Sequence, residues 1–322
     1  MPGRSKSSHP LKPPSTSQRQ MPGVTPKPPK WPSYTGTSQF VGTTPSGRVT
    51  VFVDPKLSSD GLKNAQDLVN DADRVVTAND QIFGITGGKV NVIVFAMGGA
   101  TDGTGGADHM GCTFQTGGDI EVCAAFGNSI RVSALFEAEL SECAMNGSLC
   151  GYSTGEALSR WCAAVIGQNT LADFATAPQW VRDGMPNYVD TTDPTDQSAD
   201  STGCGVAFVS WLISLGYTLD KIAQTMVALG DSGTFADLYA KLTSDSARSA
   251  WKKFQTALEA LSGGVTSDDP FGAMALATPA NRGLWTAELA ARVFSTIVTD
   301  ISAGKDAQQI VAGVRGVMEG RS

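Results

Sequence analysis

Val49-Thr-Val-Phe-Val53 and Lys89-Val-Asn-Val-Ile-Val-Phe95 are two β-rich runs, and the residues between them have a helical pattern. From Leu57 to Phe83, apolar residues recur at spacings of three and four, which is typical of a helix with one buried face. A strand, a helix and a second strand in this order predict a βαβ-like unit at the start of the folded chain.

Downstream of this unit the pattern changes from strands to helices. Residues 112–123 are expected to form a hairpin that turns on Gly117-Gly118. Helical periodicity returns at Arg131 and continues to Cys143. Further helices are expected at about 155–166, 204–215, 218–229, 234–242, 245–262, 284–301 and 306–318. This order predicts an α+β fold, with a small N-terminal mixed sheet and edge hairpin followed by a mostly helical C-terminal half.

Residues 1–47 have the composition of a disordered, basic leader. Ten of the 16 prolines fall in this segment, and the first acidic residue of the chain is Asp54. Such a segment cannot build a core. Its basic charges are dispersed, so we expect a solvated tail rather than a nucleic-acid-binding arm. The rest of the chain is divided into a domain over residues 48–262 and a helical C-terminal extension over residues 263–322.

The cysteines predict disulfides. All six lie between residues 112 and 204, and the chain has no C-x-x-C pair that would favour a metal site. We expect two or three disulfides, with one bridge across the predicted hairpin. Disulfides indicate an oxidising or extracellular setting, although the N-terminus lacks the apolar core of a secretory signal. Buried thiols are the alternative. The candidates are Cys112, Cys123, Cys143, Cys150, Cys162 and Cys204.

Two further counts limit the function. No apolar run approaches the roughly 18 residues of a membrane span, so we expect no such span. The chain has two histidines, His9 in the leader and His109 in a Gly-rich stretch. A zinc site with two imidazole ligands from the folded part of one chain is therefore excluded. His109 is expected to be a hydrogen-bonded structural residue, but it is the one imidazole that a site in the folded part could use.

The helix predicted from Arg131 contains Ala138-Glu-Leu-Ser-Glu142. Glu139 and Glu142 are three residues apart and share a helix face. Zincin metallopeptidases place His, Glu and His at positions i, i+1 and i+4 of such a helix. Here Ala138 and Glu142 occupy the two histidine positions, whereas Glu139 keeps the position of the general base. The alternative interpretation of both glutamates is an exposed helix face.

A second segment extends this resemblance. Trp180-Val-Arg-Asp-Gly-Met-Pro-Asn-Tyr-Val189 resembles the W-x-x-E-G-x-x-x-Y-V segment of gluzincin-type peptidases, especially the basic secretory protein group. That segment supplies an acidic third zinc ligand in the family, and Asp183 falls at its position. The resemblance implies a zincin-like fold over about residues 48–262. The chain also resembles a set of uncharacterised bacterial proteins that share A-E-L-[ST]-E, G-E-[AG]-L-S-R and S-T-G-C-[AG]-V, found here at 138–142, 155–160 and 201–206.

The ligand set implied by the resemblance is degenerate. Because Ala138 has no lone pair to offer, we expect no zinc and no resident cofactor. Glu142, Asp183 and His109 remain weak candidates for calcium or another hard divalent cation, because oxygen ligands suit such metals better than zinc. Four acids in residues 190–200 are expected to form a surface loop, because their spacing is not that of an EF-hand.

Glu156 and Arg160 are four residues apart in the next predicted helix, in the favourable order for an ion pair. A local salt bridge is the expected arrangement. In the alternative, the Arg160 guanidinium neutralises Glu139 and Glu142 across two packed helices and takes the place of a metal.

Together these patterns predict a catalytically degenerate zincin-like domain. We expect it to act as a binding or structural module, with a protein partner or self-assembly through the C-terminal helices. The alternative is a non-zinc hydrolase that uses the carboxyl groups of Glu139, Glu142 and Asp183 as acid and base, with or without a hard metal.

Overall fold

The computed structural model describes residues 26–99, 101–116, 118–277 and 287–318. Its sheet has five strands in the order β1-β2-β3-β5-β4. The three inner strands are parallel to one another, and β1 and β4 are antiparallel edge strands. Their bounds are β1 Gln39–Thr43, β2 Val49–Val53, β3 Val90–Phe95, β4 Ala107–His109 and β5 Asp119–Cys123.

The predicted βαβ unit is confirmed. Helix α1 (Ser58–Phe83) connects β2 to β3, and it ends where Gly84 adopts a left-handed conformation with φ 66°. The alternate valines of the parallel strands lie on one sheet face, because successive side chains of a strand point to opposite sides. Val51, Val92 and Ile120 form one such row in the strand register, and all three are buried in the main core. Helices α1 and α2 (Ser129–Ala144) pack on this core.

The opposite sheet face is covered by a segment that was expected to be disordered. Trp31 and Phe40 pack edge-on against Phe52, which is fully buried on this face. Residues 39–43 form β1, which pairs with β2. Part of the segment expected to be disordered is therefore folded. The physical reason is that its aromatic side chains bury a large apolar surface against the sheet, even though the segment is rich in proline. Residues 1–25, with His9, lie outside the described residues.

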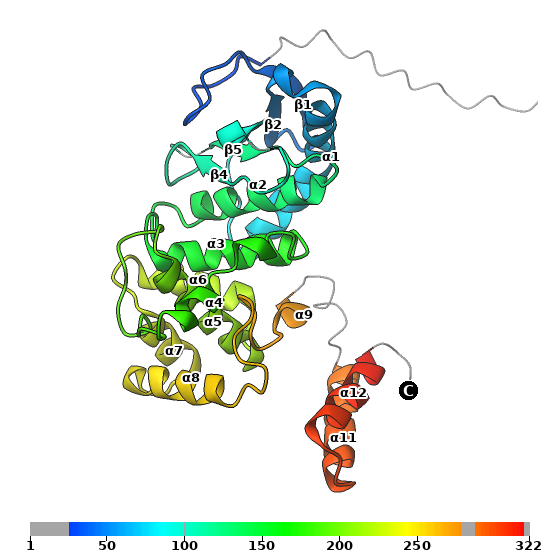
Figure 1. The fold of residues 1–322 in the computed structure, drawn as a ribbon, viewed down its shortest axis with the longest axis vertical. Coiled ribbons are helices and arrows are strands. Elements are labelled where there is room, and N and C mark those ends of the chain that lie inside the picture. The colour runs from blue at the N-terminus through cyan, green and yellow to red at the C-terminus, as the bar shows by residue number, and fades with distance from the viewer. Residues whose placement is uncertain (1–25, 100, 117, 278–286, 319–322) are drawn as a thin grey trace, which may run out of the picture.

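The second half of the fold is helical, which confirms the α+β class. Figure 1 shows α3 beside α2, with the later helices extending away from the sheet. Within the described residues, no helix is long and apolar enough to cross a membrane. The bounds are α3 Ser153–Ile166, α4 Ala177–Arg182, α5 Ala199–Ser214, α6 Leu219–Leu229, α7 Phe235–Thr243, α8 Ala250–Glu259, α9 Met274–Ala277, α11 Ala287–Ser302 and α12 Ala307–Met318.

Most predicted helices are present within a few residues of their expected ends. The helix expected over 245–262 is shorter, because a 3-10 turn at Ala247–Ser249 precedes α8. Helix α4 has no counterpart among the expected helices. Its six residues are too few for a periodic pattern to be recognised. Helices α11 and α12 pack side by side (Figure 1), and Lys305 in the turn between them forms an ion pair with Asp300 at 2.7 Å.

The predicted hairpin disulfide is wrong. The antiparallel partner of β5 is β4, so Cys112 lies in the connecting loop and not opposite Cys123. Cys112 instead forms a disulfide with Cys150, in the loop between α2 and α3. The expected two or three disulfides reduce to this one in the described chain, where the other four cysteines are buried thiols.

Candidate functional site

Helix α2 directs three residues of the Ala138–Glu142 motif into a cleft. The helix begins at the side chain of Asn128, which accepts a hydrogen bond from the backbone N–H of Arg131 at 3.1 Å. Ala138, Glu139 and Glu142 all line the cleft. The Glu139 and Glu142 side chains are 14% and 11% exposed, so their interpretation as an exposed helix face is wrong.

His109 connects the edge strand β4 to helix α2 through its side chain. It is the last residue of β4, and its Nε2 atom lies 3.0 Å from Oε2 of Glu142 and 3.9 Å from Oε2 of Glu139. The imidazole side chain is 12% exposed. The expected hydrogen-bonded histidine is therefore present, and its acceptor is one of the candidate site residues.

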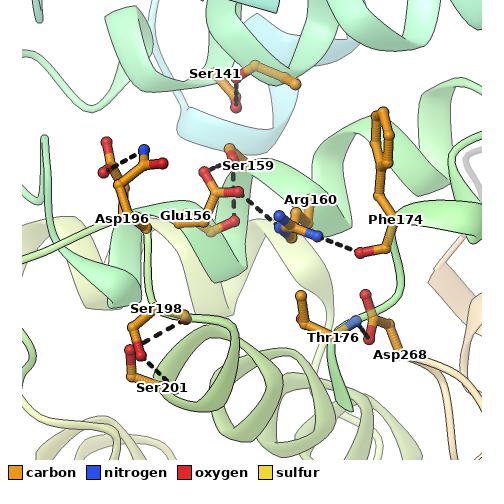
Figure 2. A network of polar contacts seen from close by, with 12 residues as sticks. Ser141, Glu156, Ser159, Arg160, Phe174, Thr176, Asp196, Ser198, Ser201 and Asp268 are labelled. Atoms are coloured by element: carbon orange, nitrogen blue, oxygen red, sulfur yellow. Dashed lines mark hydrogen bonds and ion pairs between the residues drawn. The ribbon is translucent and has the colours of Figure 1, made fainter. Parts of the chain in front are cut away.

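Helix α3 contributes the local ion pair. Arg160 Nε donates to Oε1 of Glu156 at 2.7 Å, and Arg160 Nη1 donates to the backbone carbonyl of Phe174 at 2.6 Å (Figure 2). The alternative in which Arg160 neutralises Glu139 and Glu142 is wrong. Its guanidinium is instead held by its own helix and by the loop that follows.

The cleft between these elements has a volume of about 410 Å³. Acidic residues from distant parts of the chain join its wall, namely Asp108, Asp196, Asp268 and Asp269. The loop over residues 190–200 is held against α3, where the backbone N–H of Ser153 donates to the carbonyl of Asp193 at 3.1 Å. The loop is therefore part of the cleft wall as well as of the surface.

Asp183 lies apart from this group. It is exposed at the C-terminal end of α4 and does not line the cleft. It lies near Asp200, whose pKa is raised by burial and by the Asp183 carboxyl group. The residue at the expected third-ligand position is thus not brought together with Glu139, Glu142 and His109.

Burial and mutual repulsion raise the pKa values of Glu139 and Glu156 and favour their neutral forms. Burial, followed by the neighbouring charges of Glu142 and Glu156, raises the pKa of Glu139 well above its ordinary value. Burial also raises the pKa of Glu156, although Arg160 opposes this shift. For His109, burial works against protonation, but the Glu142 carboxylate outweighs it and raises the pKa of the imidazole.

One group of side chains has the composition of a metal site. The candidate ligand atoms of His109, Glu142 and Cys150 all lie within 4.8 Å of one another. Imidazole, carboxylate and thiolate are all ligands of zinc and of other transition metals. However, the Cys150 sulfur is bonded to Cys112 in this structure, so it is not a thiolate.

The comparisons with known proteins include a distant structural likeness. No family model matches the chain, and the comparison with curated proteins gives no match. Among solved structures, native yeast LTA4 hydrolase is similar over 68% of this chain, with 13% sequence identity and a TM-score of 0.39. The match covers 38% of the hydrolase chain, so this protein corresponds to well under two thirds of its length.

The sequence patterns predicted neither the position of Cys150 near His109 and Glu142 nor the presence of Asp268 and Asp269 in the wall of the cleft. In the sequence Cys150 is one of six cysteines, and no local pattern places it beside His109. Asp268 caps the start of α4, where its Oδ1 accepts from the backbone N–H of Thr176 at 2.8 Å (Figure 2). The same oxygen also accepts from the backbone N–H of Ala177 at 2.7 Å. An acidic residue about ninety positions from the helix that it caps gives no sequence signal.

Proposed function

We propose that the cleft binds a positively charged side chain, such as the guanidinium group of a peptide arginine, and that the domain is a zincin-like binding module without peptidase chemistry. The observation that carries this proposal is the uncompensated acidity around Glu139. Its carboxyl group faces Glu142 and Glu156, while the nearby cations, His109 and Arg160, each already contact one of those two glutamates. A bound cation would stabilise the ionised form of Glu139, which burial and the neighbouring glutamates otherwise disfavour.

The loss of peptidase chemistry is proposed from the residue at the first zincin ligand position. Ala138 lines the cleft, so its methyl group occupies the place where a ligand side chain would project. Asp183, at the expected third-ligand position, lies outside the cleft lining. The order of sheet, α1, edge hairpin and α2 supports a zincin-like interpretation of the scaffold, whereas these side chains do not support zinc-assisted hydrolysis at that position.

A matched pair of peptides tests the binding proposal. Calorimetry on the intact, oxidised protein compares a short arginine peptide with the same peptide carrying citrulline, which keeps the shape of arginine but has no charge. We expect at least about tenfold tighter binding of the arginine peptide. Glu139→Gln should reduce this preference, whereas Asp183→Asn, outside the cleft, should preserve it. Equal affinity for the two peptides would refute the proposal.

Hydrolysis by a carboxyl pair is the second candidate. The observation that favours it is the contrast between Glu139, whose pKa is raised well above the ordinary value, and Glu142, which contacts His109. A carboxyl group with a raised pKa, next to a second carboxyl group, is suited to general acid catalysis. A screen of peptide and glycan substrates with the wild type and Glu139→Gln tests this candidate. Turnover that is lost in Glu139→Gln would support hydrolysis over simple binding.

A further inference from the structure

Three elements bring possible metal ligands together, two of which, His109 and Glu142, also line the cleft. His109 comes from the edge strand β4, Glu142 from the last turn of α2, and Cys150 from the loop that follows α2. Their ligand atoms lie within 4.8 Å of one another, so side-chain movements of about 1 Å would bring them to the separations around a single four-coordinate zinc ion. Of these residues, only Glu142 belongs to the Ala138–Glu142 motif. The group is therefore distinct from the ligand set that the motif would imply.

The disulfide controls whether this group is complete. With Cys150 bonded to Cys112, its sulfur carries no negative charge and is a poor metal ligand. His109 and Glu142 then remain as two ligands, fewer than a stable zinc site uses. When the disulfide is reduced, the Cys150 sulfur is freed to act as a third ligand, which is the number of protein ligands in zinc sites that keep a solvent molecule in the fourth position.

We propose that the Cys112–Cys150 disulfide is a redox switch for a transition-metal site, and that its reduction creates a zinc site formed by His109, Glu142 and Cys150, with solvent in the fourth position. A dithiol reductant transfers two electrons to the S–S bond, which breaks, while the dithiol becomes a disulfide and its two protons pass to the cysteine sulfurs. Zinc binding then releases the proton of the coordinating Cys150 thiol to solvent. Mixed nitrogen, oxygen and sulfur ligands suit zinc better than calcium or magnesium.

Backbone contacts would hold the two cysteines near the site after reduction. The backbone N–H of Gly147 donates to the carbonyl of Cys112 at 2.8 Å, which joins the two loops independently of the disulfide. The backbone N–H of Leu149 donates to the carboxylate of Asp231 at 2.7 Å, which anchors the loop beside Cys150. These contacts limit the conformational entropy that metal binding would cost.

The location of the disulfide also suits a switch. Cys112 and Cys150 are partly exposed, whereas the other four cysteines are buried. A reductant would therefore reach this disulfide without unfolding the core. Glu139, which lies 3.9 Å from the imidazole, adds negative charge near the proposed metal. The zinc site shares Glu142 with the acidic cleft, but it does not depend on the binding of a cationic peptide.

Cobalt(II) binding to the full chain tests the switch. The protein is titrated with cobalt before and after reduction by a phosphine, which converts the disulfide to two thiols as water supplies the phosphine oxide oxygen and the two protons. We expect one cobalt per reduced chain, with thiolate-to-cobalt absorption in the near-ultraviolet, displacement by zinc, and at least about tenfold weaker binding to the oxidised protein. Equal cobalt binding in both states would overturn the proposal.

Two variants locate the site. In the reduced protein, Cys150→Ser should remove the thiolate absorption of bound cobalt, whereas Cys204→Ser, at a buried thiol of α5, should keep it. If Cys150→Ser does not fold, Glu142→Gln gives the second test, because it should weaken cobalt binding while circular dichroism stays unchanged. Unaltered cobalt spectra in these variants would refute the assignment. The peptide experiment uses oxidised, metal-free protein, so either proposal can fail without the other.

Discussion

Arg131 is a buried cation that does not line the cleft itself but contacts the segment over residues 170–174, which forms part of the cleft wall. Its Nη1 and Nη2 atoms donate to the two carboxylate oxygens of Asp173 at 2.6 and 2.9 Å, and Nη1 also donates to the carbonyl of Thr170 at 2.8 Å. The guanidinium carbon lies 4.8 Å from the centre of the Phe174 ring. Because Leu171 and Phe174 line the cleft, this one side chain fixes part of its wall to the start of α2.

Arg131→Met should lower the free energy of unfolding by about 1–3 kcal/mol, measured by urea denaturation. The arginine side chain is 5% exposed, but Asp173 is 48% exposed and can be hydrated again when its partner is lost, which keeps the cost moderate. Lys63→Met is the control, because the Lys63–Asp67 pair is largely exposed and should contribute less than about 0.5 kcal/mol. Similar losses in both variants would contradict the anchoring role.

Unlike Arg131, which is paired with Asp173, Glu137 is a fully buried carboxyl group with no hydrogen-bond partner among the described residues. Burial raises the pKa of Glu137 well above its ordinary value of 4.5, while Arg74 opposes and Asp80 adds to the shift. The folded state therefore holds this proton at a pH where the unfolded chain has released it.

This raised pKa predicts that stability falls as pH rises from the unfolded value of 4.5 toward the folded pKa of Glu137. Each proton of difference contributes a slope of about 1.4 kcal/mol per pH unit. Glu137→Gln, which cannot ionise, should flatten this dependence in denaturation curves measured at several pH values. The exposed Glu259→Gln serves as control. If both variants keep the wild-type slope, Glu137 is not the group that titrates.

At the scale of elements, β5 connects the two faces of the sheet. Ile120 and Val122 of β5 lie in the main core, while Glu121, between them in the sequence, is buried on the opposite face. The carboxylate accepts hydrogen bonds from the backbone N–H groups of Ser33 and Tyr34, at 3.0 and 2.6 Å, and from the Ser33 hydroxyl at 2.6 Å. A single acidic side chain thus holds the segment that covers Phe52 and Ile93.

Glu121→Ala should detach this segment from the sheet. Because Ser33 and Tyr34 lose their shared acceptor, we expect hydrogen exchange across residues 31–40 to accelerate by at least about tenfold, while exchange in α5 changes much less. Asp108→Asn, at the paired position of β4, is the matched control. Unchanged protection of residues 31–40 in Glu121→Ala would show that the aromatic contacts alone hold the segment.

At the scale of the whole molecule, the disulfide joins the sheet to the helices. It connects the β4–β5 loop to the α2–α3 loop across a sequence separation of 38 residues. Cys112→Ser should therefore lower the free energy of unfolding by about 2–4 kcal/mol, because the unfolded chain regains the freedom of that loop. Thermal melting of wild type and variant, with and without reductant, measures this effect, and the variant should not respond to reductant.

Mass mapping of unreduced peptides provides the direct check on this connection. A Cys112–Cys150 peptide is expected, and recovery of a Cys112–Cys123 peptide would contradict the loop arrangement.

Self-assembly of the whole chain stays a prediction. Val298, Ile301 and Val311 of α11 and α12 are exposed, and light scattering at two protein concentrations measures whether the chain associates.

The sequence by itself determined what depends on local periodicity and on residue type. Alternating and three-to-four-residue patterns predicted β2, β3 and most helices, because they report which face of an element is buried. The identity of residue 138 and the histidine count excluded a zinc site with two imidazole ligands before any fold was known. The motif also identified Glu139 and Glu142, and the structure places both in a cleft.

The tertiary structure alone decided which distant side chains meet. It joined Cys112 to Cys150 rather than Cys123, placed His109 against Glu142, left Asp183 outside the cleft and covered the second sheet face with residues 31–40. Each outcome depends on where loops end and on how helices and strands are oriented when they pack, and these are set by the burial of the whole core. Local sequence patterns do not determine those orientations. The sequence could therefore identify individual candidate residues of the cleft, but it could not show which of them are in contact.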